Sequence, residues 1–509
     1  MLKLHFLLKR KGLSSTVLFK AIALGLVGTI ILICFAGCGS GKTTDSKANT
    51  AKTGKVSDSS IFSERDLEQT YDESVAEKVT LSGNEDVEIT KEGVYVLSGT
   101  LEDASVVVNV GDSEKVQLVL SGVNITNENK AGILVANADK VFITTDKESK
   151  NVISTNGEFE SYGDISNIDA AIFSKDDLTI NGLGMLSITT GNGHGIVSKN
   201  DLRITGGVLN VTAAEHGLTG KDAVKIAAGT INVTAGEKGI KSKNSDETGK
   251  GLVYICGGEI TISAGTEGIE GTKLYIKGGE IDITAKDDGL NASSNFDEDI
   301  ELEISGGKLH VDAALAQFVP DDAAGDGIDS NGSILVSGGE AYVSGSVSDG
   351  DGALDYETAA TITGGTFVAA GMSGMAENFG SDSTQGAMLV NVSTRQENKE
   401  IAVKDSDGNT ILSWTPDKSY NSVVISTPDI VKGNTYTVSL GSEKATVTMK
   451  NIIYGESTGK APGGMGGMTP PDGNNKTPPN DNFRNGNDGT QGKPGNKDGT
   501  PPEKPDSET

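Results

Sequence analysis

Residues 268–283 read Gly-Ile-Glu-Gly-Thr-Lys-Leu-Tyr-Ile-Lys-Gly-Gly-Glu-Ile-Asp-Ile, and this stretch contains three short segments in which apolar and polar residues alternate. Such alternation is typical of β-strands that bury one face. The Gly278-Gly279 pair between the second and third segments predicts a turn that needs a positive φ angle. The same pattern returns about every 21–29 residues between residues 79 and 371, for example at 195–211 and 327–343.

The repeat decides how these strands must be arranged. Strands this short cannot bury a face alone, so each is expected to stack on its copy in the neighbouring repeat, at about 4.8 Å. We therefore predict an all-β fold, a right-handed parallel β-helix of about ten coils. An antiparallel sandwich would also alternate, but it would not repeat in phase. The predicted inward column of the second segment is Ile180, Ile204, Ile226, Ile255, Ile276, Ile304, Val336 and Ile362.

The N-terminus has the features of an export signal. A basic region precedes an apolar run at residues 21–33 that is too short to span a membrane. Phe-Ala-Gly-Cys at residues 35–38 resembles a bacterial lipobox, in which the Cys is lipidated before cleavage. The alternative is an ordinary signal peptide with a chance Cys. We predict a lipoprotein on the extracellular face of the cell membrane, exposed to the cell wall and held only by a lipid on Cys38.

Composition shifts along the chain predict its domains. Hairpin signals at 407–409 and 432–434 indicate an antiparallel module, and the last residues are Gly, Pro, Asn, Asp and Lys with few apolar residues. We predict a signal peptide at 1–37, a flexible tether at 38–72, the β-helix at 73–385, a small capping β module at 386–455 and a disordered tail at 456–509.

The charge of the chain limits its partners. The formal net charge is −28, from 71 acidic and 43 basic side chains among 509 residues. Nucleic acids and anionic lipid surfaces are excluded as partners, because they are bound by clustered Lys and Arg. With only 3 Cys the chain has no disulfide framework. We expect a monomer.

Acidic residues gather where the first segment of successive repeats should stack. The column before the Gly is predicted to read His194, His216, Lys238, Glu267, Asp288, Asp326 and Asp351. Stacked like charges repel unless a cation lies between them, and oxygen ligands favour Ca²⁺. The alternative is solvated acids in turns; the two His side chains are expected to cap turns rather than hold a softer metal. The candidate calcium ligands are Asp322, Asp326, Asp329, Asp351, Asp355, Glu267, Glu270, Asp287 and Asp288.

A basic and aromatic stripe is predicted on the outward side of the second segment. Lys225, Tyr254 and Tyr275 fall in one column, and the flat faces of tyrosines can pack on sugar rings. Lys241, on the first segment, is a further candidate for sugar contact. Ordinary stacking between neighbouring strands is the alternative.

Several motifs carry a resemblance to a known family. They are Gly-Asp-Gly-Ile-Asp-Ser-Asn-Gly at 325–332, Ser-Gly-Gly at 337–339, Ala-Leu-Asp-Tyr at 353–356, Thr-Gly-Gly-Thr at 363–366, Val-Ala-Ala-Gly at 368–371 and Ser-Thr-Gln-Gly at 383–386. Over residues 75–445 the chain resembles the carbohydrate-binding secreted β-helix proteins of cellulolytic clostridia, which are related in fold to pectate lyases. The resemblance implies Ca²⁺ binding and affinity for polygalacturonate and cellulose, without demonstrated cleavage.

Three functions remain open from the sequence. The first is a non-catalytic lipoprotein that binds an acidic polysaccharide through Ca²⁺. The second is a calcium-dependent polysaccharide lyase, which needs a Lys or Arg base beside the metal. Lys241 is predicted about four coils, or roughly 19 Å, from the Asp cluster, but only about one coil from Glu267 and Glu270. The third is a structural spacer or adhesin of the cell envelope.

Overall fold

The structure of the protein is a computed structural model that describes residues 61–296, 298–314 and 325–458. These residues are almost entirely strand and turn, and the one helix among them is a single turn, α3 (Glu64–Leu67). The all-β prediction is therefore confirmed. No helix in this part of the chain is long and apolar enough to cross a membrane. The predicted signal peptide, Cys38 and the tail from residue 459 onward lie outside the described residues.

The first segment of each repeat forms an 11-stranded sheet in which neighbouring strands are parallel. Its strands, in chain order, are β2 (Val87–Ile89), β4 (Val106–Asn109), β6 (Ile133–Asn137), β9 (Ala170–Ser174), β12 (His194–Ser198), β15 (Leu218–Gly220), β18 (Ile240–Ser242), β20 (Ile269–Gly271), β22 (Leu290–Ala292), β24 (Ile328–Ser330) and β26 (Asp355–Tyr356).

The second and third segments form most of a 19-stranded sheet. From β19 onward the two segments run on as one long strand in each repeat. The parallel strands are β1 (Ala76–Leu81), β3 (Gly93–Glu102), β5 (Lys115–Asn127), β7 (Lys140–Thr145), β8 (Lys150–Thr155), β10 (Asp177–Gly182), β11 (Met185–Thr190), β13 (Asp201–Ile204), β14 (Val208–Ala213), β16 (Ala223–Ile226), β17 (Thr230–Ala235), β19 (Leu252–Ala264), β21 (Lys273–Ala285), β23 (Glu301–Asp312), β25 (Ser333–Ser344) and β27 (Ala359–Gly371).

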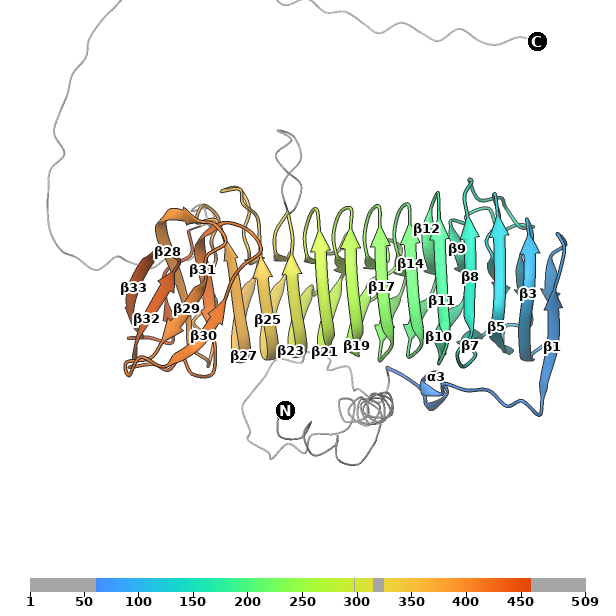
Figure 1. Ribbon diagram of the computed structural model, residues 1–509, viewed down its shortest axis with the longest axis horizontal. Coiled ribbons are helices and arrows are strands. Elements are labelled where there is room, and N and C mark those ends of the chain that lie inside the picture. Colours follow the sequence, from blue (N-terminus) through green and yellow to red (C-terminus); the bar gives the residue numbers. More distant parts are fainter. Residues whose placement is uncertain (1–60, 297, 315–324, 459–509) are drawn as a thin grey trace, which may run out of the picture. The chain divides into compact units, whose positions relative to one another are not determined.

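Each strand pairs in parallel with the equivalent strand of the next repeat, so the chain winds into stacked coils (Figure 1). Ile255 lies opposite Ile276, and Ile276 opposite Ile304. All eight members of the predicted inward column stack in this register and are at most 2% exposed. The apolar side chains of the three segments meet inside the coils as one continuous core.

Two kinds of glycine allow the coils to close. Gly279 has a φ of 98°, as the Gly-Gly turn predicts, and an L side chain rarely adopts that conformation. Gly327 is needed for a different reason, because a Cβ there would lie 2.4 Å from Cγ1 of Val343 across the coil. The backbone of the first segment therefore packs directly against a side chain of the third segment, and this contact fixes the position of the residues that flank Gly327.

Beyond β27 the chain changes to antiparallel pairing. β31 (Tyr420–Ser426) pairs antiparallel with both β27 and β28 (Ala387–Gln396), and β34 (Ile453–Tyr454) joins β28. A separate antiparallel sheet has the order β30-β29-β32-β33. Its strands are β29 (Ile401–Lys404), β30 (Thr410–Trp414), β32 (Thr435–Leu440) and β33 (Glu443–Thr448). These strands share a second apolar core and cover part of β27, the last strand of the parallel series.

The residues before β1 correct one sequence prediction. Residues 61–70, which we call the strap, fall within the predicted flexible tether, but they are packed on the outward side of the large sheet. Asp66 of α3 is 2% exposed, and its side chain receives a hydrogen bond from Thr179 of β10. A buried charge with specific partners holds this segment in place, so residues 61–70 are not a free tether.

Candidate metal centre

Three carboxylates meet at one edge of the 11-stranded sheet. Single carboxylate oxygens of Asp326, Asp329 and Asp355, which we call the triad, all lie within 4.8 Å of one another. The parallel register brings them together, because Asp329 of β24 pairs with Asp355 of β26. Asp326 precedes β24 by two residues and lies on the same edge. The triad therefore contains three of the residues that were predicted as calcium ligands.

Burial and neighbouring carboxylates raise the pKa values of Asp326 and Asp329. Burial, followed by the charges of Asp288, Asp355 and Asp329, raises the pKa of Asp326 to about 8, although the Gly352 N–H donates to it. Burial and the charges of Asp288 and Asp355 raise the pKa of Asp329 to about 7. A raised pKa means that the ionised carboxylates lack sufficient stabilisation from their surroundings. A bound cation would supply that stabilisation.

Asp288 and Asn291 lie in the coil that neighbours Asp326 and Asp329. Asp288 accepts hydrogen bonds at 2.6 Å from the Asp326 N–H and from Asn291 Nδ2, and burial leads the effects that raise its pKa to about 6. Asn291 pairs with Asp329 in the strand register. Its side-chain oxygen is buried and has no hydrogen-bond partner among the described residues. An unpaired acceptor opposite Asp329 is a further candidate ligand, and it was not among the predicted calcium ligands.

The donor set fits a hard divalent cation. Ca²⁺ takes six to eight oxygen ligands at about 2.3–2.6 Å, from carboxylates, amide oxygens and backbone carbonyls. Among the described residues, no Lys, Arg or His forms an ion pair with a member of the triad, which leaves their charge uncompensated. Three carboxylates and the buried oxygen of Asn291 would supply four of the required oxygens. The thiolate and imidazole ligands that softer metals prefer are not part of this cluster.

The register also corrects the predicted position of Asp351. Gly327 N–H donates to the carbonyl of Gly352, so Gly352 and not Asp351 occupies the place above Asp326. The last first-segment coil has Ala353 where the coils from β12 to β24 have Gly, and this alignment moves Asp351 one residue away. Its Oδ2 lies 3.4 Å from Ser346 Oγ instead of joining the triad. Burial raises the pKa of both Asp351 and Asp287, and the charge of Asp351 raises the pKa of Asp287 further. Asp322 lies outside the described residues.

Glu267 and Glu270, which are among the predicted calcium ligands, form ion pairs with lysines. Lys238 Nζ contacts Glu267 and lies 3.2 Å from Glu270, while Lys243 Nζ lies 3.1 Å from Glu270. Burial is the largest single effect and opposes ionisation of Glu267, but the hydrogen bonds from Lys238 and Thr266 and the charge of Lys238 together lower the pKa of Glu267. Because two ammonium groups already neutralise these carboxylates, a cation gains little there. Lys238 directly precedes Glu267 in the stacked column, which is the signal that could have revealed this pairing.

Lys241 lies beside this ion-pair cluster and against the histidines. It pairs with Glu270 in the strand register, and its Nζ is 2.9 Å from Nε2 of His216. His194 and His216 stack with ring centroids 4.5 Å apart, and Nδ1 of each accepts a backbone N–H from the next coil. The two histidines therefore act as turn caps. Lys241 is three strand spacings from Asp329, or about 14 Å.

The predicted sugar-stacking stripe is covered. Tyr254 is 3% exposed and Tyr275 is 7% exposed, because Ile61 and Phe62 of the strap pack on that side of the sheet. Lys225 donates to Asp201 at 2.6 Å. The three residues do share one outward column, since Lys225 pairs with Tyr254 and Tyr254 with Tyr275. The column was predicted correctly, but its exposure was not, and a sugar ring cannot stack on the buried tyrosine faces.

The chain is similar to known proteins over part of its length. The model of the carbohydrate-binding domain-containing protein family matches residues 83–374 of this chain. A carbohydrate-binding domain-containing protein of Acetivibrio thermocellus is 42% identical over 130 residues, which are 25% of this chain and 45% of that relative. The chain thus spans less than half the length of the curated relative it matches. A gadolinium derivative of the polysaccharide lyase-like protein from C. thermocellum covers 45% of this chain and 98% of its own, with 34% identity and a TM-score of 0.41.

Proposed function

We propose, from the premise that this chain belongs to the family of carbohydrate-binding domain-containing proteins, that it binds an acidic polysaccharide such as polygalacturonate through Ca²⁺ held by the triad. The observation that carries the proposal is the meeting of Asp326, Asp329 and Asp355 within 4.8 Å without a compensating cation in the described chain. In this proposal the protein binds its ligand without cleaving it, and cellulose is a further candidate ligand.

The charge of the protein explains why a metal is needed. A chain with a net charge of −28 repels a polyuronate, and the triad is the most crowded part of that charge. A bound Ca²⁺ supplies a local positive charge and open coordination positions for sugar carboxylate or hydroxyl oxygens. The triad residues hold the ion, Asn291 offers a neutral oxygen, and Asp288 orients the Asp326 backbone through its 2.6 Å hydrogen bond.

Two further parts of the proposal concern the setting of this site. We assign the stacked coils of residues 73–385 to a right-handed parallel β-helix, and the in-register parallel ladders support this assignment. We also propose that a lipid on Cys38 anchors a monomer to the cell surface. The lipobox-like residues 35–38 support the anchor, which would place the coils where wall and plant polysaccharides are accessible.

The proposal is tested by retention of the protein on immobilised polygalacturonate, with Ca²⁺ or with EGTA. Wild type should be retained with Ca²⁺ and released by EGTA, and Asp329→Asn with Asp355→Asn should lose at least tenfold in affinity. The matched control is Asp164→Asn with Asp382→Asn, which makes the same charge change at exposed positions and should bind like wild type. Equal binding by both double variants would refute a role for the triad.

Lys241 favours a second candidate function, a polysaccharide lyase. Burial, with the charges of Lys238 and Lys243, lowers the pKa of Lys241, and a lowered pKa favours a general base. Its neighbours Glu267 and Glu270 are occupied by lysines, and the triad is several coils away, which weakens this candidate. Sustained ultraviolet absorbance from an unsaturated product, lost in Lys241→Ala, would establish the lyase and overturn the binding proposal.

A further inference from the structure

The strap follows one outward column of the large sheet from coil to coil. The strand register defines this column, which contains Gln117, Phe142, Thr179, Arg203, Lys225, Tyr254 and Tyr275. Thr70 accepts from Gln117, Arg65 lies 4.5 Å over the ring of Phe142, and Phe62 packs edge-on against Tyr254. The strap, which includes the helical turn α3, thus crosses several strands of the large sheet.

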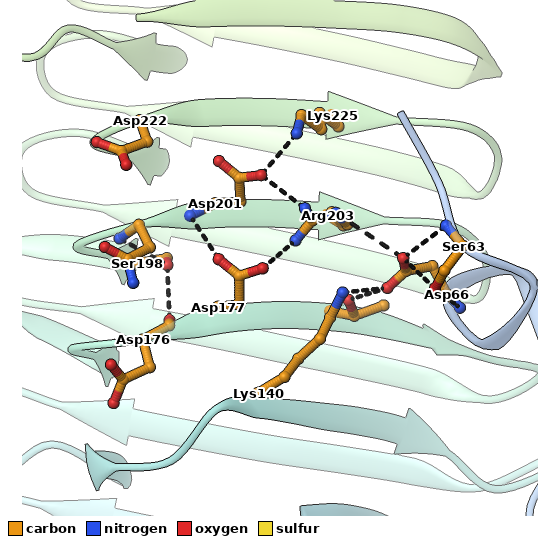
Figure 2. Close-up of polar contacts among 12 residues, drawn as sticks. Ser63, Asp66, Lys140, Asp176, Asp177, Ser198, Asp201, Arg203, Asp222 and Lys225 are labelled. Carbon is orange, nitrogen blue, oxygen red and sulfur yellow. Dashed lines mark hydrogen bonds and ion pairs between the residues drawn. The ribbon is translucent and has the colours of Figure 1, made fainter. Parts of the chain in front are cut away.

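Asp66 is the centre of the strap's attachment (Figure 2). Its carboxylate lies 2.5 Å from Lys140 Nζ, accepts from Thr179 Oγ1 at 2.7 Å, and accepts from the backbone and side chain of Ser63. Arg203 Nε is 3.9 Å away and has no hydrogen-bond partner among the described residues. Lys140, Thr179 and Arg203 come from three successive coils, β7, β10 and β13. Together these three side chains form a carboxylate-binding site on the outside of the coils.

The charges around this site balance only when Asp66 is present (Figure 2). Arg203 bonds Asp177 at 2.7 Å and Asp201 at 2.6 Å, and Lys225 also bonds Asp201 at 2.6 Å. The sheet therefore contributes Lys140, Arg203 and Lys225 against two carboxylates, which leaves one positive charge. Asp66 supplies the matching negative charge, and without the strap one anion would be missing from a site that is otherwise complete.

The strap can leave without opening the coils. No strap residue belongs to the continuous core, and its apolar contact is a small cluster of Ile61 and Phe62 with Tyr254, Cys256 and Tyr275. Its other attachments are the ion pairs of Asp66, the contact of Arg65 with Phe142, and hydrogen bonds to the outward side of the sheet, such as Gly182 N–H to Gln69 and Asn181 Nδ2 to the Glu68 carbonyl. Release would expose Tyr254 and Tyr275 beside the cationic site and leave the stacked strands paired.

We propose that the column from Phe142 to Tyr275 is a second polysaccharide-binding surface, specific for carboxylate-bearing sugars, and that the strap covers it with Asp66 in the position of a sugar carboxylate. Lys140 and Arg203, with the hydroxyl of Thr179, recognise the carboxylate. The tyrosines, once uncovered, supply flat faces for the adjoining sugar rings. Binding here needs no metal, so the surface is independent of the triad and its failure would leave the calcium-dependent site standing.

The test uses the full chain in EGTA and follows two quantities. One is amide hydrogen exchange of residues 61–70, and the other is affinity for polygalacturonate. Asp66→Lys places a third cation beside Lys140 and Arg203 and should expel the strap, while Asp66→Asn removes the charge with little change in shape. Asp72→Lys is the matched control, because Asp72 is exposed and makes only a local bond to Ser74.

In Asp66→Lys we expect at least tenfold faster exchange of residues 61–70 and at least tenfold tighter binding of polygalacturonate, with smaller changes in Asp66→Asn. Asp72→Lys should show neither the faster exchange nor the tighter binding. Fully methyl-esterified polygalacturonate, which lacks the carboxylates, should bind Asp66→Lys no more tightly than it binds wild type. In wild type, excess polygalacturonate should accelerate exchange of the strap by competing with it. Faster exchange in Asp66→Lys without any gain in binding would overturn the surface. Unchanged exchange in both Asp66 variants would overturn the cover.

Discussion

Asp329 lies directly opposite Asp355 in the parallel register of β24 and β26, and one carboxylate oxygen of each lies within 4.8 Å of the other and of one carboxylate oxygen of Asp326. A parallel ladder places like residues together, and here it concentrates negative charge that the described chain does not neutralise. The contrast with Glu267 and Glu270 is instructive, because Glu270 lies in the same register column as Asp329 and Asp355, yet both glutamates contact lysines, namely Lys238 and Lys243. The predictions below follow from this difference.

Calcium should stabilise the fold through the triad. An ion at a hundred times its dissociation constant adds about 2.7 kcal/mol to the free energy of unfolding. We expect a melting temperature several degrees higher in Ca²⁺ than in EGTA, measured by calorimetry. Asp326→Asn with Asp329→Asn should abolish the calcium response, whereas Asp164→Asn with Asp382→Asn should retain it. An identical melting temperature of wild type in Ca²⁺ and EGTA would favour solvated acids.

Without calcium, stability should fall as the pH rises from 6.5 to 8. The folded-state pKa values of Asp326 and Asp329, about 8 and about 7, are above those of unfolded Asp, so the folded state binds more protons in this window. Each extra proton makes the free energy of unfolding decrease by about 1.4 kcal/mol per pH unit. Burial lowers the pKa of His216 to about 2, so its opposing effect is confined to lower pH.

Denaturant unfolding in EGTA at several pH values measures this slope. Asp326→Asn should flatten it, and saturating Ca²⁺ should remove it in wild type, because the bound ion replaces the protons. A stability that rises between pH 6.5 and 8 in EGTA would contradict the crowded carboxylates.

Gly327→Ala should damage the coil that carries the triad. The added Cβ would lie 2.4 Å from Val343 Cγ1 and 2.5 Å from the carbonyl oxygen of Ala353. Gly327 lies between Asp326 and Asp329 in the sequence, so a shift of its backbone would move both carboxylates. Overpacking of this kind costs about 1–3 kcal/mol. We expect that loss of unfolding free energy together with weaker calcium binding by titration calorimetry. Gly350→Ala is the control, since its nearest neighbour would be 3.4 Å away, and equal behaviour of the two variants would argue against the tight contact.

Tyr275→Phe should leave calcium-dependent polysaccharide binding unchanged. Tyr275 is covered by the strap, and its hydroxyl donates to Glu301 at 2.8 Å. The variant should lose about 1 kcal/mol of stability from this hydrogen bond and retain wild-type affinity in Ca²⁺. A large loss of affinity would show that the tyrosine column contacts the glycan even while the strap covers it.

The interior of the coils could be predicted because it is periodic. Ile276 and its equivalents recur in phase, and a parallel ladder turns that phase directly into contacts. The Gly-Gly turn was equally predictable, since Gly279 needs the positive φ that its neighbours lack. The same periodicity brought Asp329 and Asp355 together correctly.

The errors arise where periodicity ends. Asp351 was placed one residue wrongly because the last coil has Ala353 in the glycine position, and only the bond from Gly327 to Gly352 reveals the shift. The strap could not be foreseen, since Asp66 meets Thr179 and Arg203 more than a hundred positions later with no repeat to indicate it. Burial of Tyr254 and Tyr275 follows from that contact.

A crystal structure of the protein with Ca²⁺ and an oligogalacturonide tests the central claim most directly. The account predicts a cation coordinated by carboxylate oxygens of Asp326, Asp329 and Asp355 at about 2.3–2.6 Å, with a galacturonate oxygen completing its shell. A triad without a cation at saturating calcium, or a cation there that no galacturonate oxygen contacts, would contradict it.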